Sequence, residues 1–325
     1  MMLSSNRRKL LDVFRAADGK LVSGQEIADA LECSRTAVWK HIEELKKAGF
    51  EIEAKRGSGY SIQPSEELFT EEMLYFRAKT EFIGQQVAFY KEVASTQIIA
   101  HQLVGEGAVD GTVVIADQQT AGKGRLARPW DSQKGTGIWM STILRPNIPM
   151  QQVPQLTFIA SLAVAEAIDN VTGLDAQIKW PNDLYIDKRK VCGVLTEMQA
   201  EAERVHAIII GTGINVNQLE FPEELRDKAT SLAILAGKTI SRGALYGEIV
   251  VQLEKYYQLF LDQGFAPIKL LWEARAIPFQ EKIVAKTLQG EIRGTVKGIS
   301  DEGVLIVRDA VGVEHAIFSA DISLG

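Results

Sequence analysis

The feature that most constrains the fold is a series of apolar, strand-like runs between residues 69 and 272, several of which follow one another without an intervening helix. TVVIADQ and HAIIIGTGINVN are rich in β-branched residues, as buried strands are. A doubly wound parallel sheet needs a helix after nearly every strand, so this order predicts a mixed α+β sheet. We also predict strands over VAFYKEV, GIWMSTILRP, QIKWPNDLYID and VCGVLTEM, and long helices over PQLTFIASLAVAEAIDNV and SRGALYGEIVVQLEKYYQLFLDQG.

The first 64 residues have the pattern of a winged helix-turn-helix. Apolar residues recur at helical spacing over residues 6–17, and Ser23 with Glu26 is a capping-box signature for a second helix. Ser34 is placed to cap a third helix, which Gly49 ends. EIEAKRGSGYSI then predicts two short strands around a Gly-Ser-Gly turn, which would form the wing.

We expect this N-terminal unit to bind DNA. It carries a net charge of +2 and the rest of the chain carries −8, the pattern of a nucleic-acid module on an acidic body. The third helix would present its first turn to the major groove, and the wing would contact phosphates. The side chains expected to contact DNA are Arg35, Thr36, Trp39, Lys40, Lys55 and Arg56. A three-helix protein-interaction module with a solvated charged face is the alternative.

Two changes in composition predict the domain boundaries. The segment from Pro64 to Glu67 is interpreted as a linker, and the last fifty or so residues contain short strand-like runs broken by glycine. That spacing predicts a small β-barrel from the runs EKIVAKTL, GEIRGTVKGIS, GVLIVRDA and VEHAIFSADISL. The predicted domains are therefore residues 1–64, 65–272 and 273–325.

Composition also excludes several classes of protein. No apolar run approaches the ~18 residues needed to cross a bilayer, so we expect no membrane association. Cys33 and Cys192 are the only cysteines, and the four histidines are not paired at metal-ligand spacing. We therefore expect a cytoplasmic protein with no disulfide framework and no built-in zinc site.

The loop QQTAGKGRLARPW, residues 118–130, concentrates positive charge and lacks the spaced apolar residues of a helix or strand. Its small residues would let backbone N–H groups approach an anion, with charge supplied by Lys123, Arg125 and Arg128. The loop also matches the dinucleotide fingerprint G-x-G-x-x-A, but Pro129 forbids the helix which that motif must open. A solvated charged loop is the alternative.

Two further stretches point to an anionic ligand. KWPNDLYIDKRKVCGVLTEM groups Lys179, Asn182, Asp183 and Lys190. Mg²⁺ is often bound through one or two carboxylates plus phosphates, and lysines can meet phosphate and carboxylate oxygens. GTGINVN ends an apolar strand with glycines and Asn215, which would close over a small ligand. A Pro-Asn-Asp turn and a simple strand end are the alternatives, but with the cationic loop the three stretches predict an adenylate-like site.

The motifs STQ (residues 95–97), QTAGKGRLARPW, KWPNDLYIDKRKVCGVL and GTGINVN, behind a winged helix, resemble the bifunctional biotin–protein ligases that are also biotin operon repressors. The resemblance covers the whole chain. It implies a winged helix, a seven-stranded mixed-sheet catalytic domain related to lipoate ligases, and an SH3-like β-barrel. It also implies a biotin–[acetyl-CoA-carboxylase] ligase that forms biotinyl-5′-AMP and transfers biotin to a lysine of biotin carboxyl carrier protein.

The residues of the site are likewise implied by the resemblance. The expected biotin-binding set is Ser95, Thr96, Gln97, Gln119, Lys123, Gly124, Arg125 and Lys190. The expected ATP-binding set is Arg128, Trp130, Lys179, Asn182, Asp183 and Asn215. Trp130 would be a platform for adenine and Asp183 the Mg²⁺ ligand, while catalysis would rest on Lys190, Arg125 and Lys179.

The sequence departs from the family pattern in the cationic loop. Lys123 stands where the usual Gly-Arg-Gly-Arg has its first arginine, which removes bidentate geometry. The segment Leu126-Ala127-Arg128 lacks a glycine common in some members, and both changes are expected to affect loop closure more than chemistry. The resemblance further implies operator DNA of biotin genes as a partner and a homodimer when the adenylate is bound. A lipoate or octanoyl ligase of the same fold and a non-catalytic biotin-sensing repressor are the alternatives.

Overall fold

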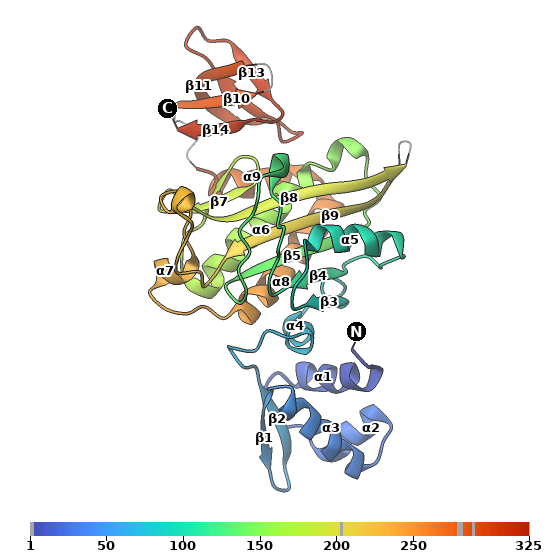
Figure 1. Cartoon of the computed structure of the whole chain (residues 1–325). Coiled ribbons are helices and arrows are strands. Elements are labelled where there is room, and N and C mark those ends of the chain that lie inside the picture. Colours follow the sequence, from blue (N-terminus) through green and yellow to red (C-terminus); the bar gives the residue numbers. More distant parts are fainter. Residues whose placement is uncertain (1–2, 202–203, 278–281, 288–289, 325) are drawn as a thin grey trace.

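The computed structural model describes residues 3–201, 204–277, 282–287 and 290–324 of the chain. Three parts follow one another along the molecule: a helical unit at the N-terminal end, a large mixed sheet in the middle and a small β-domain at the C-terminal end (Figure 1). This is the α+β architecture predicted from the sequence. Within the described ranges, no helix is long and apolar enough to cross a membrane.

The N-terminal unit is the predicted winged helix-turn-helix. Ser23 and Glu26 form a complete capping box, and the Ser34 hydroxyl accepts from the Ala37 amide. These side-chain hydrogen bonds satisfy amides at the helix starts that would otherwise lack partners, which is why the local sequence predicts the starts well. The elements are α1 (Ser5–Ala17), α2 (Gly24–Leu31), α3 (Arg35–Lys47) and the antiparallel strands β1 (Glu51–Lys55) and β2 (Gly59–Gln63).

A short helix that was not predicted, α4 (Glu71–Arg77), joins this unit to the sheet. Its Leu74 packs into the core of the central sheet. Other side chains of α4 pack into the core of the winged helix, namely Met73, Tyr75 and Phe76. The helix therefore belongs to both hydrophobic cores and fixes the N-terminal unit against the sheet.

The central sheet has seven strands in the order β3-β4-β5-β9-β8-β7-β6. Strands β3 and β4 run parallel and the other neighbours antiparallel, which gives the predicted mixed sheet. QIKWPNDLYID was predicted as one strand but forms two, because Pro181 has no amide hydrogen for the ladder and lies in the turn between them. The bounds are β3 (Val87–Tyr90), β4 (Val113–Ala116), β5 (Gly137–Leu144), β6 (Gln177–Lys179), β7 (Asp183–Ile186), β8 (Arg189–Glu201) and β9 (Arg204–Asn215).

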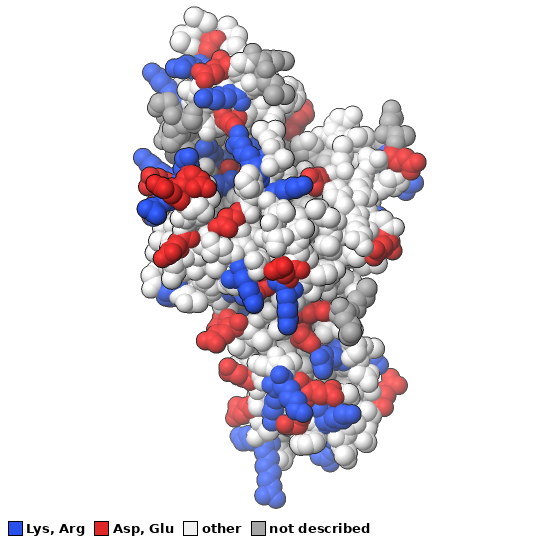
Figure 2. Space-filling view, in the orientation of Figure 1, with Lys and Arg blue, Asp and Glu red and all other residues white. Residues whose placement is uncertain are grey.

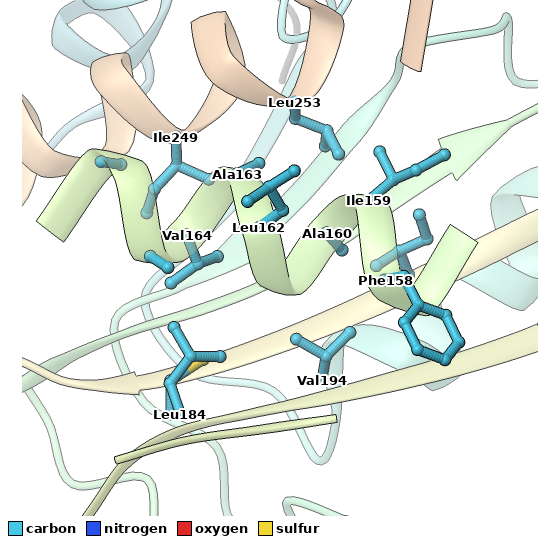
Figure 3. Packing of buried hydrophobic residues seen from close by; sticks show 14 of the residues in the cluster. Phe158, Ile159, Ala160, Leu162, Ala163, Val164, Leu184, Val194, Ile249 and Leu253 are labelled. Carbon is cyan, nitrogen blue, oxygen red and sulfur yellow. The ribbon is translucent and has the colours of Figure 1, made fainter. Parts of the chain in front are cut away.

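Helices cover both faces of this sheet. The helix α5 (Thr96–Gly105) packs on β4, β5 and β9, and α6 (Gln155–Thr172) packs on β6 to β9. Behind α6 lie α8 (Arg242–Gln263) and α9 (Phe265–Arg275). The helix α9 extends three residues beyond residue 272, the predicted end of the central domain. The long predicted helices correspond to α6 and α8, whereas α5, α9 and the short α7 (Leu232–Ala236) were not predicted. In Figure 3 the apolar side chains of α6 lie between the sheet and α8, as shown by Leu184, Val194, Ile249 and Leu253.

The C-terminal β-domain is an antiparallel sheet in the order β13-β12-β11-β10-β14. VEHAIFSADISL was predicted as one run but turns after residue 317, so it supplies two strands; residues 281 and 288 of EKIVAKTL lie outside the described ranges. The domain is docked on the central sheet through Trp180, whose indole Nε1 donates to the Gly303 carbonyl over 3.1 Å. The strands are β10 (Lys282–Thr287), β11 (Gly290–Ile299), β12 (Leu305–Arg308), β13 (Glu314–Ile317) and β14 (Asp321–Leu324).

Candidate active site

A cavity of about 360 Å³ lies where the central sheet, the cationic loop 118–130 and the β-domain meet. Its wall combines the start of α5, the loop, β7, β8, β9, a segment over residues 221–229, and Asp321 of the β-domain. Most of the predicted site residues line it: Ser95, Thr96, Gln97, Gln119, Lys123, Gly124, Arg125, Arg128, Trp130, Asn182, Asp183, Lys190 and Asn215. The fold therefore brings together motifs that are far apart in the sequence.

One part of the cavity wall is polar and held by its own hydrogen bonds. The Thr96 amide donates to Oε1 of Gln119 over 2.9 Å, and the Thr96 and Ser141 hydroxyl oxygens are 2.8 Å apart. Nε2 of Gln119 donates to the Ser132 hydroxyl over 2.8 Å. Because both ends of the Gln119 amide are engaged, this part of the wall is organised before a ligand arrives.

The floor of the cavity depends on glycines in the central strands. A Cβ atom at Gly213 would lie 2.5 Å from Nε1 of Trp130, and one at Gly193 would lie 3.0 Å from the same indole ring. A Cβ at Gly211 would lie 3.0 Å from the Gln97 carboxamide. These glycines lie inside β8 and β9 rather than at a strand end, so they allow side chains to approach the backbone of the sheet.

Lys190 and Asp183 form an ion pair on neighbouring strands, with 2.7 Å between Nζ and Oδ1. Lys190 Nζ also lies 5.2 Å from the centre of the Trp130 ring, within cation–π range. Both side chains are about three-quarters buried, at 27% and 24% exposure, so their charges are only partly screened by water. The lysine still has donors to offer to an anionic ligand.

Two buried asparagines connect the strands to the rest of the cavity wall. Nδ2 of Asn182 donates to the Val194 carbonyl over 2.6 Å, and its Oδ1 accepts from Arg125 over 3.2 Å. Asn215 donates to the Thr230 carbonyl over 3.2 Å. Asn182 lies in the turn between β6 and β7 and also lines the cavity, so the turn and the cavity wall are formed by the same stretch.

The cationic loop is held by contacts with the β-domain. Arg125 donates to the Ser319 hydroxyl over 2.8 Å, and Arg128 donates to both carboxylate oxygens of Asp321. The Arg128 guanidinium lowers the pKa of the Asp321 carboxyl, which keeps the pair charged at neutral pH. Arg128 is 61% exposed, so water and salt weaken this contact.

One of the two departures from the family loop pattern, the segment Leu126-Ala127-Arg128, falls in a strained part of the backbone. Leu126 and Ala127 have φ values of 55° and 57°, in the left-handed region. A residue with a Cβ pays roughly 1–2 kcal/mol to adopt that conformation, which glycine adopts freely. The loop is therefore strained at the segment that lacks the family glycine, and Leu126 is 73% exposed there.

Lys179 is the predicted site residue that does not line the cavity. Its ammonium lies 5.0 Å from the centre of the Tyr185 ring, and Tyr185 lines the cavity instead. Burial lowers the pKa of Lys179, and the nearby Asp183 carboxylate opposes that shift. Lys179 is three residues before Asn182 in sequence, but its side chain is not part of the cavity wall; its assignment to the ATP site stays a prediction.

Several wall residues were missed by sequence reasoning. Phe221, Leu225 and Lys228 come from a segment after β9 that contains the short 3-10 helix Glu223–Leu225, and Asp321 comes from the β-domain. Local spacing gave no signal for them, because they reach the cavity through tertiary contacts. Motif position could have suggested Asp131, which directly follows the loop and accepts from Gln218 over 2.9 Å, and Tyr185, which lies within the motif KWPNDLYID.

The predicted DNA-contact residues are all exposed, at the start of α3 and on the wing. A second cavity, of about 340 Å³, lies between the start of α3 and the wing, with Arg35, Lys55 and Arg56 in its wall. In Figure 2, Lys and Arg side chains protrude at this end of the molecule. Trp39, on α3, is 60% exposed and therefore accessible to a partner. The exposed set is Arg35, Thr36, Trp39, Lys40, Lys55 and Arg56.

The chain combines a winged helix with a mixed sheet whose cavity is lined by cationic side chains. These features define the class of protein: an enzyme that carries a DNA-binding module. Family models agree with this division of the chain. The model of the biotin/lipoate A/B protein ligase family matches residues 91–215, and a helix-turn-helix (HTH) domain model matches residues 6–61. A model of the biotin protein ligase C-terminal domain matches residues 281–325.

Individual relatives narrow the class. Bifunctional ligase/repressor BirA of Bacillus subtilis (strain 168) is 48% identical over 326 residues and covers 100% of both chains. The protein of the same name from Escherichia coli (strain K12) is 28% identical over 95% of this chain and 94% of that one. A solved biotin protein ligase from Aquifex aeolicus in complex with biotin and ATP is 32% identical, with a TM-score of 0.65, over 74% of this chain and 99% of that one. The chain belongs to the family of bifunctional biotin–protein ligases and repressors.

Proposed function

We propose that this protein is an ATP-dependent biotin–protein ligase that also represses transcription of biotin genes in response to biotin. The observation that carries the ligase function is the convergence of Lys190, Arg125 and Trp130 in one cavity. Two cations there would face a reacting phosphate and carboxylate, and an aromatic ring lies on the glycine floor beside them. A lipoate ligase of the same fold is the second candidate, because the matched family model includes both activities.

The proposed reaction has two steps. An oxygen of the biotin carboxylate attacks the α-phosphorus of ATP and displaces pyrophosphate, which gives biotinyl-5′-AMP. The amine of an acceptor lysine on biotin carboxyl carrier protein then attacks the carbonyl of the mixed anhydride and releases AMP. Neither step needs a covalent enzyme nucleophile, so catalysis would rest on positioning and charge neutralisation.

Each group on the cavity wall has a proposed role in this scheme. Lys190 would bridge the biotin carboxylate and the α-phosphate, and Arg125 would neutralise the phosphate from the opposite wall. Trp130 would contact the adenine or the tail of biotin, and the loop would exclude water from the anhydride. Lys179, behind Tyr185, would contribute charge rather than a direct contact. The full proposed set, with the roles assigned from the sequence, comprises Ser95, Thr96, Gln97, Gln119, Lys123, Gly124, Arg128, Asn182, Asp183 and Asn215.

Mg²⁺ is a proposed cofactor, and the donor set fits it through one carboxylate. Among the residues that the structure describes, no three His, Cys, Asp or Glu side chains gather as a metal cage. Asp183 provides a carboxylate on the wall beside Lys190, and Mg²⁺ commonly takes its other ligands from phosphate and water. Bound there, the ion would neutralise charge on the pyrophosphate.

The repressor function would depend on a homodimer. A single winged helix buries only about 600–1,000 Å² on DNA, so two modules on a palindrome would be needed for tight binding. Strand β8 supports a dimer at the sheet, because its pairing with β7 ends at Gly193 and the described strands leave that edge open over residues 195–200. We propose that the carrier protein competes for the same edge of β8.

We also propose that the chain divides into three domains, residues 1–64, 65–272 and 273–325.

The test of the ligase function is incubation of the protein with ATP and either biotin or lipoate, together with an acceptor domain. We expect AMP release and acyl transfer with biotin and not with lipoate. AMP release with lipoate alone would favour the second candidate. Biotin binding without AMP release would make the protein a sensor and refute the ligase proposal.

A further inference from the structure

A hydrogen-bonded chain runs from the cavity wall to the surface through Gln97, Glu197 and His101. Gln97 lies in the first turn of α5 and lines the cavity, whereas Glu197 and His101 do not. Nε2 of Gln97 donates to Oε2 of Glu197 over 3.0 Å. His101 Nε2 lies 2.9 Å from the same carboxylate oxygen. Glu197 therefore receives two contacts, one from the cavity side and one from the surface side.

The carboxylate determines which way the Gln97 amide faces. An ionised carboxylate accepts hydrogen bonds and cannot donate, so the amide nitrogen of Gln97 must face Glu197. Its oxygen, Oε1, then faces away, and it is buried without a hydrogen-bond partner among the described residues. Gly211 leaves room for this arrangement, because a Cβ there would lie 3.0 Å from both Cδ and Oε1 of Gln97. An unsatisfied buried acceptor on a cavity wall is costly unless a ligand satisfies it.

The His101 ring is itself oriented by the side-chain amide of Gln199. Nε2 of Gln199 donates to the His101 carbonyl oxygen over 3.0 Å, and the same nitrogen lies 2.9 Å from His101 Nδ1. Because an amide nitrogen only donates, Nδ1 must accept, and the ring proton lies on Nε2 and points to Glu197. The donors therefore converge on Glu197, from Gln199 through His101 on one side and from Gln97 on the other.

We propose that Glu197 is a positioning residue that, with His101 behind it, makes Gln97 present an acceptor to an N–H group of the substrate. This inference rests on the proposed function: the ureido ring of biotin carries two N–H groups, whereas the dithiolane ring of lipoate carries none. A site built to bond a substrate N–H rejects an analogue that lacks it, because the buried acceptor stays unpaired. The orientation of one carboxamide would therefore contribute to the choice of biotin over lipoate.

The first test is the affinity of the full-length chain for biotin, measured by calorimetry without ATP. In Glu197→Gln the neighbour can donate as well as accept, so the Gln97 amide is free to flip, and we expect the biotin Kd to rise roughly tenfold. The KM for ATP should not change. Glu201→Gln is the matched control, because Glu201 lies on the same strand and also pairs with a histidine, His206, at 3.4 Å. An unchanged biotin Kd in Glu197→Gln would overturn the inference.

The second test exchanges the two groups. Gln97→Glu alone places two carboxylates where the donor and acceptor now lie 3.0 Å apart, and biotin affinity should fall. In the double variant Gln97→Glu/Glu197→Gln a donor again faces a carboxylate, whose second oxygen faces the cavity, so affinity should be restored. The pair would be shown to act structurally if the loss of biotin affinity in the double variant equals the sum of the losses in the two single variants. Thermal melting must show that the double variant is folded.

The outcomes separate this inference from the proposed function. A wild-type chain that binds no biotin would overturn both. A wild-type chain that binds biotin and releases AMP, while Glu197→Gln binds biotin equally well, would overturn the positioning role and leave the ligase function standing.

Discussion

The two walls of the cavity are built in different ways. Lys190 and Asp183 lie on the neighbouring strands β8 and β7 of the sheet, and the register of β7 on β8 sets the distance between them. Arg125 and Arg128 lie on a loop that backbone hydrogen bonds anchor near its ends, and its tip contacts Asn182, Ser319 and Asp321 through side chains.

This difference separates a fixed wall from a wall that a ligand can move. Strand residues are held by backbone ladders and a dry core, so their geometry does not depend on what is bound. The loop is strained at Leu126 and Ala127, and its exposed ion pair with Asp321 is worth only about 0–1 kcal/mol. An anionic ligand would offer the loop cations a stronger partner, so we expect the sheet to serve the chemistry and the loop to respond to the ligand.

The largest expected effect is on the fixed wall. Lys190→Ala should raise the activation free energy of adenylate formation by about 2–4 kcal/mol, because it removes the charge beside the reacting oxygens. The fold should be intact, and pyrophosphate release is the measurement. Lys188→Ala, in the exposed turn of the same hairpin, is the matched control. Near-wild-type pyrophosphate release in Lys190→Ala would break the assignment of chemistry to the sheet.

Asp183→Asn should have the next largest effect. Losing the carboxylate should raise the activation free energy of the first step by about 1.5–3 kcal/mol, the usual value of a hydrogen bond to a charged group. It should also raise the Mg²⁺ concentration that the reaction requires. Transfer from supplied biotinyl-5′-AMP should be spared, because that step no longer involves pyrophosphate. Equal loss in both steps would mean that Asp183 acts only by pairing with Lys190 in the folded strands.

Gly213→Ala probes the contact between the two walls. The added Cβ would lie 2.5 Å from Trp130 Nε1, so the indole must move off the sheet, at a cost of about 1–3 kcal/mol. We expect weaker binding of biotin and ATP, measured by calorimetry, with smaller effects on stability. Gly105→Ala is the control, because a Cβ there meets nothing within 4 Å. Unchanged ligand affinity in Gly213→Ala would mean that Trp130 does not contact the ligand.

The smallest effect is expected at the tether between loop and β-domain. Asp321→Asn removes the charge that pairs with Arg128 and should change stability by at most about 1 kcal/mol. Limited proteolysis of the free protein should cut the loop faster in this variant, and bound adenylate should remove the difference. Because pairing lowers the pKa of Asp321, the tether is present at neutral pH and is lost as the pH falls through that lowered pKa. A loop cut equally fast in both proteins would contradict the tether.

The sequence predicted what local rules determine. Caps at Ser23 and Ser34, the helical periodicity of α1 and the turn of the wing depend on neighbours a few residues away, and these were right. The helix α4 was missed because its apolar side chains face two different cores and leave no single stripe.

The limits of the site prediction have the same cause. The quoted motifs contain most residues of the cavity wall. Asp321 lies outside them and reaches the cavity only because the β-domain docks there. Lys179 was assigned a direct role from its proximity to Asn182 in sequence, yet its ammonium lies over Tyr185. Contacts across long sequence separations, and the direction of a side chain within a strand, were beyond what the spacing of residues could predict.

The most direct measurement compares dimerisation and operator binding with no ligand, with biotin alone, and with biotin plus ATP. If the loop wall senses the adenylate, its ordering should favour the dimer, and the two equilibria must be coupled reciprocally by about 1–3 kcal/mol. Sedimentation should therefore show the dimer, and operator binding should tighten, chiefly when both substrates are present. Equal dimer fractions and equal operator affinity in all three conditions would contradict a loop that links ligation to repression.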